Sequence, residues 1–334
     1  MGQSKPIGFA VVGCGLIGQR RAAAVPPGAL RYACDLERTR AERIAIQHQG
    51  CIATDKLEQL LVDQSVTAVM VSTVNSSLAQ IALAAVKAGK HVLVEKPAAL
   101  RTADLEEIEQ SADLTGSRVR IGYNHRYHPS FLKARELIVQ QQLGEPFMVR
   151  GRYGHGGRRG YDREWRADPK LSGGGELIDQ GVHLIDLAGS FLGEWAGVDG
   201  HAATYYWDMP VDDNAFLSLR TADGSTAWLH VSCSEWKNLF CFEIYFRQAK
   251  LQIDGLGGSY GMERLSYHRM LPEMGPPETT IFEFPRGDQS WAHEVKEFVT
   301  DIEQQRLPRP GIAEARSVLR VVETIYTTSG FGPS

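Results

Sequence analysis

The stretch "AVVGCGLIGQR" at residues 10–20 joins a short apolar run to three glycines at positions 13, 15 and 18. The spacing G-x-G-x-x-G after a strand and before a helix is typical of a dinucleotide-binding turn. The first glycine allows the tight turn, the second lets backbone approach a pyrophosphate, and the third lets helix and strand pack closely. Because the N-terminus of a helix attracts phosphate, the residues predicted to bind the cofactor here are Gly13, Gly15, Leu16, Ile17 and Gly18.

An acidic residue follows at the distance that this motif requires. Asp35 ends the second predicted strand, 22 residues after Gly13, where its carboxylate would accept hydrogen bonds from the adenosine ribose. A 2′-phosphate would meet a like charge there, which favours NAD over NADP. Arg38 lies close enough in sequence to accommodate such a phosphate, and Asp35 could instead cap the helix that begins near Arg38.

The first part of the chain alternates strand-like and helix-like segments, which is the pattern of a parallel sheet covered by helices. The predicted strands are "IGFAVVG", "LRYACD", "TAVMVST", "HVLVEK" and "VRIGY". The predicted helices between them include residues 39–48, 77–88 and 103–112. We therefore expect residues 1–124 to form a doubly wound Rossmann domain of the α/β class.

After a predicted helix at residues 128–142, strands follow one another without helices between them, which indicates a large, mostly antiparallel sheet. The predicted strands are "PFMVRGRYGH", "GHAATYYW", "AFLSLRT", "STAWLHVSCSEW", "FCFEIYFR" and "TTIFEFP". A helix at 176–191 interrupts them, and helices at 290–305 and 311–328 close the chain. We expect residues 125–334 to form an α+β domain for substrate binding and oligomerisation.

The composition is that of an ordinary globular protein, with 43% hydrophobic and 23% charged residues in 334. A net charge of -4 argues against a partner nucleic acid, which would favour a basic face. The five cysteines show no C-x-x-C spacing and are expected to be reduced thiols. The start of the chain lacks the features of a signal peptide, and no run of about 18 apolar residues occurs, so we expect a cytoplasmic protein without a membrane partner.

Two further segments complete a recognisable set. Residues 72–97 contain "STVN", "AGKHV" and "EKP", and residues 173–186 read "GGGELIDQGVHLID". With the glycine motif and the closing "PRPGIAEARSVLRVVETIYTTS", these segments resemble the Gfo/Idh/MocA oxidoreductases. The resemblance spans both predicted domains. It implies a Rossmann domain followed by a domain whose large sheet carries the substrate site and packs against another subunit.

The resemblance also assigns residues. It implies that Lys96 of the E-K-P motif, Asp179 and His183 form the catalytic set. It further implies that the cofactor is bordered by a loop and a strand end that contribute Ser72, Thr73, Asn75, Glu95 and Lys96. The chain departs from the common family pattern at Val74 and Leu78, which puts the conformation of that loop in doubt rather than the chemistry. The segment "YNHRYHP", with Asn124, Arg126 and Tyr127, is similar to the family's interdomain segment.

The spacing of Asp179 and His183 suggests their roles, because side chains four residues apart lie on the same stripe of a helix. A histidine has a reference pKa of about 6.5, so His183 is expected to accept the hydroxyl proton of an alcohol as hydride leaves. Asp179 would orient it or bind a neighbouring hydroxyl, and Lys96 would stabilise charge on the reacting oxygen. The roles of Lys96 and His183 could be exchanged. Alternatively, Asp179 and His183 could form an ordinary surface hydrogen bond, and the glycines could be only a flexible segment at the start of the helix.

Residues 153–170, "YGHGGRRGYDREWRADPK", place aromatic and guanidinium groups directly before the glycines at 173–175. Such groups suit a polyhydroxylated ring or an anionic substituent, and His155, Trp165 and Arg166 are predicted to bind substrate with Asp179 and His183. The alternative is an ordinary basic surface loop. No zinc-binding spacing, nucleophile elbow or P-loop occurs in the sequence, so we expect no metal and no hydrolase or NTPase activity.

Together these features predict an NAD-dependent oxidoreductase that acts on a ring hydroxyl or ketone of a sugar, cyclic polyol or nucleotide sugar. Two other functions remain open, because a fold does not determine its activity. One is a catalytically silent NAD-binding sensor or assembly protein, and the other is a redox-neutral NAD-dependent glycosidase. Exposed sheet edges and faces require cover, so a homodimer or homotetramer is expected.

Overall fold

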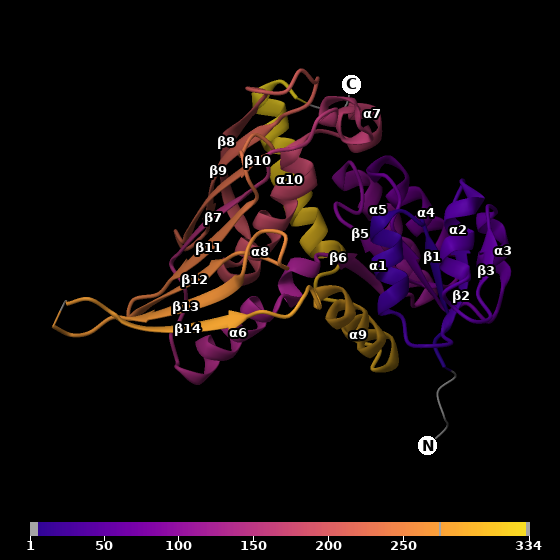
Figure 1. Cartoon of the computed structure of the whole chain (residues 1–334), viewed down its shortest axis with the longest axis horizontal. Coiled ribbons are helices and arrows are strands. Elements are labelled where there is room, and N and C mark those ends of the chain that lie inside the picture. Colours follow the sequence, from indigo (N-terminus) through magenta and orange to yellow (C-terminus); the bar gives the residue numbers. More distant parts are fainter. Residues whose placement is uncertain (1–5, 274, 332–334) are drawn as a thin grey trace. The chain divides into compact units, whose positions relative to one another are not determined.

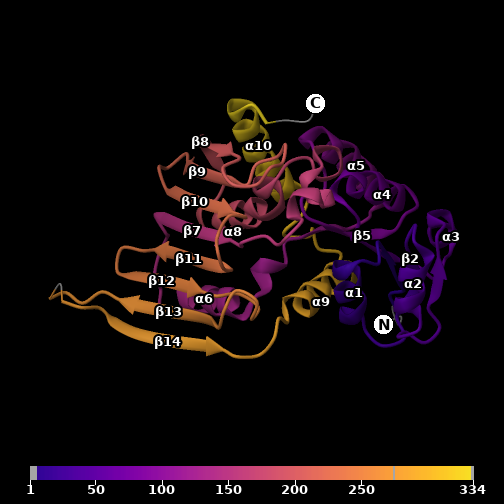
Figure 2. The ribbon, with the colours of Figure 1, turned by 45° about the horizontal axis from the view of Figure 1, so that its top comes forward.

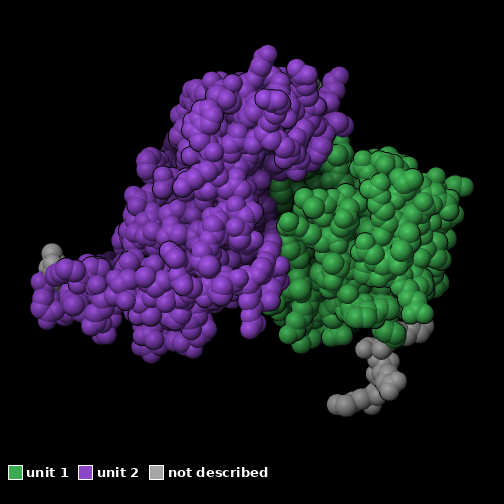
Figure 3. All heavy atoms as spheres, in the orientation of Figure 1, with its two compact units in different colours: residues 1–123, 291–316 green, residues 124–290, 317–334 purple. Residues whose placement is uncertain are grey.

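The computed structural model of the chain describes residues 6–273 and 275–331, so part of the N-terminal stretch examined for a signal peptide lies outside it. The chain divides into two compact units, coloured separately in Figure 3. Unit 1 holds the described residues up to Tyr123 together with Trp291–Arg316, and unit 2 holds Asn124–Ser290 with the described residues from Ser317 on. This division differs from the predicted single boundary after residue 124, because a late helix returns to the first unit.

Unit 1 contains a six-stranded sheet in the order β3-β2-β1-β4-β5-β6, with every strand pair parallel. Its strands are β1 (Phe9–Val12), β2 (Leu30–Cys34), β3 (Ile52–Thr54), β4 (Ala68–Val71), β5 (His91–Glu95) and β6 (Val119–Gly122). Its helices are α1 (Leu16–Ala24), α2 (Arg38–Ala45), α3 (Leu57–Val62), α4 (Asn75–Lys87) and α5 (Thr102–Thr115), labelled in Figure 1, together with most of α9 (Ser290–Glu303). This arrangement confirms the predicted Rossmann sheet.

The buried strands explain why the sequence predicts this sheet well. All residues of β1 and β4 are buried, as expected for parallel strands covered on both faces. The strand that the sequence analysis missed, β3, has only three residues, and its Ile52 is exposed. A strand this short lacks the apolar run that marks its neighbours.

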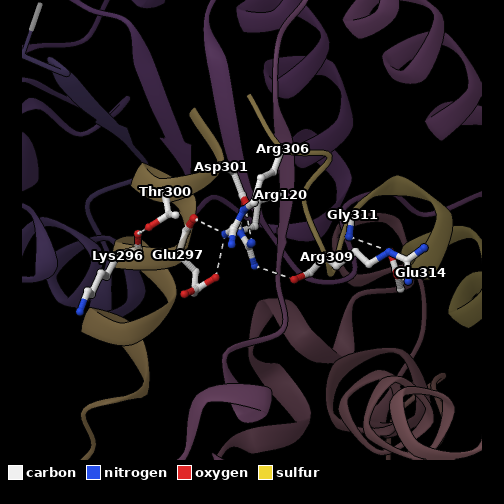
Figure 4. Close-up of polar contacts among 9 residues, drawn as sticks. All are labelled: Arg120, Lys296, Glu297, Thr300, Asp301, Arg306, Arg309, Gly311 and Glu314. Carbon is white, nitrogen blue, oxygen red and sulfur yellow. Dashed lines mark hydrogen bonds and ion pairs between the residues drawn. The ribbon is translucent and has the colours of Figure 1, made fainter. Parts of the chain in front are cut away.

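Helix α9 joins unit 1 through both apolar and charged contacts. Val295 and Phe298 belong to the same buried cluster as Phe9 and Leu30, so the apolar face of the helix completes the core of this unit. Figure 4 shows the polar contacts at its end. The Asp301 carboxylate accepts from the buried Arg120 of β6 at 2.8 Å and from Arg306 at 2.9 Å.

Unit 2 contains an eight-stranded sheet in the order β14-β13-β12-β11-β7-β10-β9-β8, and Figure 2 shows the strands in this order. The strands are β7 (Met148–Gly154), β8 (Trp195–Ala203), β9 (Asn214–Thr221), β10 (Thr226–Ser232), β11 (Leu239–Tyr245), β12 (Ala249–Asp254), β13 (Glu263–Arg269) and β14 (Glu278–Phe284). Only the central pair β7 and β10 is parallel, which confirms the prediction of a mostly antiparallel sheet. Strands β12 and β13 are additional to those predicted.

The helical segments of unit 2 are short except for three. The longer ones are α6 (Pro129–Gln140), α8 (Val182–Leu192) and α10 (Ile312–Ser329), whose first residues belong to unit 1. The short ones are η1 (Asn124–Tyr127), η2 (Tyr161–Arg163), η3 (Trp165–Ala167), α7 (Pro169–Ser172) and the π-helical turn η4 (Leu177–Gly181). Helix α6 packs on β12, β13 and β14, and α8 packs on β7 and β10. None of the helices in the described part of the chain has the length and apolar character needed to cross a bilayer.

The predicted helix at 176–191 differs from the structure in its first turn. Residues Leu177–Gly181 form a π-helical turn, and the α-helix proper begins at Val182. The π-helix is rare, and single π turns are frequently found at functional sites. Asp179 lies in this π turn and His183 lies in the first turn of α8.

Candidate active site

The glycine turn of unit 1 has the geometry that each glycine position requires. Gly13 has φ +88°, and a Cβ atom there would lie 2.5 Å from the Ser72 carbonyl oxygen. A Cβ atom on Gly18 would lie 1.8 Å from the Gly13 carbonyl oxygen, so helix α1 can approach β1 only with glycine at this position. A Cβ atom on Gly15 would meet nothing within 4 Å. Space is therefore open at the one position where backbone must approach a phosphate.

The start of α1 is also suited to an anion. The N-cap is Gly15, no side chain caps the helix, and its first turn carries no acidic residue. The first amide groups of a helix have no partner within the helix, so they are available to a phosphate. Leu16 is exposed and Ile17 half-buried, which leaves their backbone, rather than their side chains, as the predicted contact.

Asp35 is fixed beside this turn by two backbone amides. Its Oδ2 atom accepts from the Cys14 N–H at 2.7 Å, and its Oδ1 atom accepts from the Glu37 N–H at 2.8 Å. Each carboxylate oxygen can accept more than one hydrogen bond, so this arrangement leaves acceptor capacity for ribose hydroxyls. Arg38 forms an exposed ion pair with Glu42 at 3.2 Å.

The loop after β4 lies directly beside the glycine turn. The Ser72 N–H donates to the Val12 carbonyl at 2.7 Å, and the Thr73 hydroxyl accepts from Ser77 at 3.2 Å. Asn75 is buried at the first position of α4. Leu78, one of the departures from the family pattern, is fully buried, so it contributes to the core of unit 1.

The end of β5 is held by a buried ion cluster. The Glu95 carboxylate accepts from Arg21 Nε at 2.7 Å, and the Arg21 Nη1 atom lies 2.5 Å from the Glu294 carboxylate. After Glu95 the chain turns sharply, since the Ala98 N–H donates to the Glu95 carbonyl at 2.9 Å and Ala98 has φ +74°. Lys96 lies within this turn, at the carboxyl end of a central parallel strand. The side chain of Glu95, a residue predicted to border the cofactor, binds Arg21.

In unit 2 a second carboxylate fixes the glycines that precede Asp179. Asp212 is fully buried and accepts from the N–H groups of Gly175 and Leu177, each at 2.8 Å, and from the Tyr326 hydroxyl at 2.6 Å. A Cβ atom on Gly175 would lie 1.8 Å from the Asp212 carbonyl oxygen. The glycines therefore serve close packing, which excludes the alternative that they are only a flexible entry to the helix.

Asp179 is paired with one of the residues predicted to bind substrate. It is 7% exposed, and its Oδ2 atom accepts from Arg166 Nε at 2.9 Å. The Arg166 guanidinium lies over the Trp165 ring at 4.6 Å from its centroid, a cation–π contact. Burial lowers the pKa of Arg166, but the charges of Asp179, Tyr161 and Glu164 and the hydrogen bond to Asp179 together raise it by more, so the net shift is upward. The structure thus brings together Trp165, Arg166 and Asp179.

His155 contacts a buried carboxylate that the sequence analysis did not single out. Its Nε2 atom lies 3.6 Å from Glu176, and its Nδ1 atom accepts from the Gly157 N–H at 3.0 Å. Burial lowers the pKa of His155, but the hydrogen bond and charge of Glu176 together with the charge of Asp179 make the net shift upward. The Tyr161 ring contacts His155 edge-on at 5.4 Å.

His183 stacks on a second histidine that the sequence analysis also missed. The rings of His125 and His183 are 3.7 Å apart between centroids, with an interplanar angle of 26°. The residue after His125 is Arg126, which makes two hydrogen bonds of 2.7 Å to Asp186, three positions after His183. The Arg126–Asp186 ion pair lies next to the two histidines in sequence. It could have suggested the stack, but the sequence does not show that Arg126 binds Asp186.

Among residues 6–273 and 275–331, no group of three or more histidine, cysteine, aspartate or glutamate side chains could hold a metal ion. The groups suited to a cofactor are those of a dinucleotide site in unit 1. An open position at Gly15, exposed helix amides and a fixed Asp35 carboxylate fit a pyrophosphate and a ribose.

Comparison with known families agrees with this reading of the site. Residues 7–123 match a family described as "Oxidoreductase family, NAD-binding Rossmann fold", and residues 131–252 match one described as "GFO/IDH/MocA C-terminal domain". The two matches together cover most of the chain and correspond to its two halves.

Several curated proteins are similar in sequence. D-glucoside 3-dehydrogenase of Escherichia coli (strain K12) is 26% identical, over 98% of this chain and 97% of its own length. Inositol 2-dehydrogenase of Salmonella typhimurium is 33% identical, over 43% of this chain and 44% of its length. Levoglucosan dehydrogenase of Pseudarthrobacter phenanthrenivorans is 28% identical, over 52% of this chain and 45% of its length. The last two alignments therefore span less than half of those relatives.

Solved structures share the whole fold. Levoglucosan dehydrogenase in complex with NADH and levoglucosan superposes with a TM-score of 0.85 at 18% identity, over 98% of this chain and 97% of that one. UDP-N-acetylglucosamine 3-dehydrogenase from Acidithiobacillus ferrooxidans gives a TM-score of 0.81 at 20% identity, over 97% of each chain. At these identities the likeness establishes the fold alone.

Proposed function

The chain belongs to the GFO/IDH/MocA family of oxidoreductases, and on this premise we propose that it is an NAD-dependent dehydrogenase or ketoreductase. Its proposed substrate is a ring secondary alcohol, or the matching ketone, of a sugar, a cyclic polyol or a nucleotide sugar. The observation that carries the proposal is the buried pair Asp179 and His183, a carboxylate and an imidazole on one rigidly held segment. A silent NAD-binding protein has no need of such a pair.

The cofactor residues proposed are those of the glycine turn with Asp35 and the loop at Ser72, Thr73 and Asn75. When bound, the nicotinamide accepts a hydride from the alcohol carbon or returns one to the ketone. Two backbone amides hold the Asp35 carboxylate in place, so it cannot turn away from a 2′-phosphate. This restraint supports NAD as the cofactor rather than NADP.

We assign the proton transfer to His183. The imidazole takes the hydroxyl proton as the carbonyl forms, and it returns the proton in the reverse reaction. Asp179, whose direction is set by Arg166, accepts a hydrogen bond from the reacting or the neighbouring hydroxyl. Lys96 donates a hydrogen bond to the reacting oxygen and stabilises the negative charge that develops on it.

The substrate class is supported by the groups around Asp179 and by the names of the similar proteins, which act on glucosides, inositol, levoglucosan and a nucleotide sugar. Trp165 offers an aromatic face to a sugar ring, and Arg166 and His155 offer donors to hydroxyl or anionic groups. These residues belong to the same unit as Asp179 and His183.

The test is the absorbance of reduced nicotinamide with NAD or NADP across inositols, aldoses, glucosides, uronic acids and sugar nucleotides. Activity with NAD is expected to fall by about 10²–10³ in Lys96→Met, because an oxyanion donor is lost. Lys87→Met is the matched control, since Lys87 is exposed and pairs with Glu107, and it should keep full activity. Asp35→Ser should raise the KM for NAD and reduce the ratio of kcat/KM with NAD to kcat/KM with NADP.

Two results would contradict the proposal. Tight NAD binding with no turnover across the panel would favour a sensor or assembly protein. Release of a leaving group without net formation of NADH would identify a redox-neutral glycosidase. Within the dehydrogenase reading, a His183→Ala variant with nearly full kcat and an unchanged pH profile would transfer the role of base to Lys96.

We also propose that the chain forms a homodimer or a homotetramer. The large sheet of unit 2 ends in two edge strands, β8 and β14, and Trp228 on β10 is 61% exposed. Unpaired edges and large exposed apolar side chains are normally covered. Light scattering at micromolar concentration should give a multiple of the chain mass, and a monomer would contradict the proposal.

A further inference from the structure

His125 is held at both ring nitrogens and by its ring face. Its Nδ1 atom lies 3.2 Å from the Asn124 side-chain oxygen, and its Nε2 atom lies 3.3 Å from the Tyr153 hydroxyl. One face of the ring stacks on His183 at 3.7 Å. All of these residues belong to unit 2, and the two histidines are 7% and 4% exposed.

A chain of hydrogen bonds determines which His125 nitrogen carries the proton. The Ser290 hydroxyl donates its single proton to the Asp288 carboxylate at 2.6 Å, so it must accept from the Asn124 amide nitrogen at 2.8 Å. The Asn124 oxygen therefore faces His125. Because an amide oxygen can only accept, the Nδ1 atom of His125 donates to it.

The remaining nitrogen of His125 is then the acceptor. In a neutral imidazole only one nitrogen carries a proton, so Nε2 accepts from the Tyr153 hydroxyl. Burial raises the pKa of Tyr153 well above its ordinary value, so this hydroxyl keeps its proton. The surroundings of His125 thus match the neutral ring with the proton on Nδ1.

The stack itself limits what His125 can do. Two rings that lie face to face at 3.7 Å do not direct their nitrogen atoms at each other, so no proton passes between them through this contact. What a neutral aromatic face offers instead is attraction for a cation placed over it. A charged His125 would repel a charged His183 at this distance.

We propose that His125 is a positioning residue for His183. The neutral ring face of His125 stabilises the imidazolium that forms when His183 accepts the substrate proton. The inference deepens the proposed function, since it rests on His183 as the base. Arg126 supports the arrangement by holding η1 to α8 through Asp186, so that the two rings meet in one register.

Other charged groups near His183 must be considered before the titration is interpreted. Among the described residues, the elements packed on α8 are η1, η4, β7 and β10. Their titratable or charged residues are His125, Arg126, Tyr127, Arg150, Arg152, Tyr153, Asp179 and His230, and α8 itself adds Asp186. Burial lowers the pKa of His230, so it titrates below an ordinary histidine.

The test compares His125→Phe, which keeps a flat ring without nitrogen atoms, with His125→Ala, which removes the ring. The readouts are the NMR titration of the His183 ring in the protein without added substrate, and the pH profile of kcat/KM. In His125→Ala the midpoint of His183 is expected to fall by about half a pH unit, as the loss of a cation–π contact implies. The acid limb of the profile should move with it, and kcat should fall about threefold, the rate equivalent of that shift. His125→Phe should keep both values near those of the unaltered protein.

Two further variants separate this role from general packing. His230→Ala is the matched control, because His230 also stacks on an aromatic ring, Phe216, at 4.4 Å and hydrogen-bonds a side-chain amide, that of Asn214. It should leave the His183 midpoint unchanged. Tyr153→Phe removes the hydroxyl at Nε2 but keeps the ring that packs on His125, so it too should leave the His183 midpoint unchanged.

The proposal is overturned if His125→Ala leaves the His183 midpoint unchanged, or if His125→Phe shifts it as far as His125→Ala does. Failure of the proposed function gives a different result. In that case no substrate is oxidised by the unaltered protein, while the NMR midpoints still follow the presence of the ring.

Discussion

Each compact unit buries a carboxyl group whose pKa is raised, and the two units surround that group differently. In unit 1, burial raises the pKa of Glu294 to about 7, although Arg21 lies 2.5 Å from its carboxylate. In unit 2, burial raises the pKa of Asp212 to about 6, and its partners there are two peptide N–H groups and the Tyr326 hydroxyl. One cluster is ionic, and the other consists of a carboxyl group and neutral donors.

Both clusters hold segments that carry residues of the candidate active site. The ionic cluster includes Glu95, which precedes Lys96, and the cluster at Asp212 fixes the glycines that precede Asp179. A buried charge that loses its partner costs several kcal/mol, whereas a network of neutral donors loses one hydrogen bond at a time. The comparison therefore predicts that unit 1 is the more sensitive to a single substitution.

The largest effect is expected for Arg21→Met. The change leaves the buried Glu95 carboxylate without its cation, and the free energy of unfolding should fall by about 3–5 kcal/mol. Urea unfolding measures this. Arg20→Met, an exposed neighbour on the same helix, is the control and should change stability by less than about 0.5 kcal/mol. An Arg21→Met variant as stable as the control would mean that the ion cluster makes no net contribution to the free energy of unfolding.

A smaller effect is expected from pH. Glu294 has a pKa of about 7 in the folded chain against 4.5 as its ordinary value, so between these pH values the folded state binds more protons. Stability from this group is therefore complete below pH 4.5 and is lost as the pH rises through 7. Between pH 5 and pH 8 the free energy of unfolding of the unaltered protein should fall by about 2 kcal/mol more than that of Glu294→Gln, because the glutamine cannot ionise. Parallel stability curves for the two proteins would contradict the raised pKa.

Tyr326→Phe tests the neutral cluster and should cost less than Arg21→Met. The variant removes the donor to Asp212, the Ile178 N–H loses its bond to the Tyr326 oxygen, and the Gly175 N–H keeps only its bond to Asp212. The expected loss is about 1–2 kcal/mol. Tyr245→Phe is the control, because Tyr245 is half-buried and its hydroxyl donates a single bond to Glu243. A loss for Tyr326→Phe that exceeds the loss for Arg21→Met would reverse the comparison.

The smallest effect is expected for Arg306→Ala. Arg306 and the buried Arg120 both bind Asp301, but the Arg306 side chain is 40% exposed. Removing a partly exposed partner while Arg120 stays in place should cost at most about 1 kcal/mol. Arg120→Met should lower the free energy of unfolding by about 3 kcal/mol. Thermal unfolding of the two variants therefore compares the contributions of two cations that bind the same carboxylate. Equal losses would show that burial does not set the size of the effect.

Much of the fold could be predicted from the sequence because its signals are local. The glycines at 13, 15 and 18 mark a strand–turn–helix by spacing alone, and the fully apolar β1 and β4 mark central parallel strands. The short β3 and the strands β12 and β13 were missed, since a short or half-polar run gives a weak signal. The return of α9 to unit 1 could not be predicted, because it depends on contacts between Phe298 and residues far away in sequence.

The candidate site divides in the same way. The sequence determined which chemical groups are present and in what order: the glycine turn, Asp35, Lys96, Asp179 and His183, each within a short motif. Only the tertiary structure placed His125 on His183, Arg21 between Glu95 and Glu294, and Asp212 against the glycines. A motif records neighbours along the chain, whereas these contacts join residues 37 to 273 positions apart, and only packing brings such residues together.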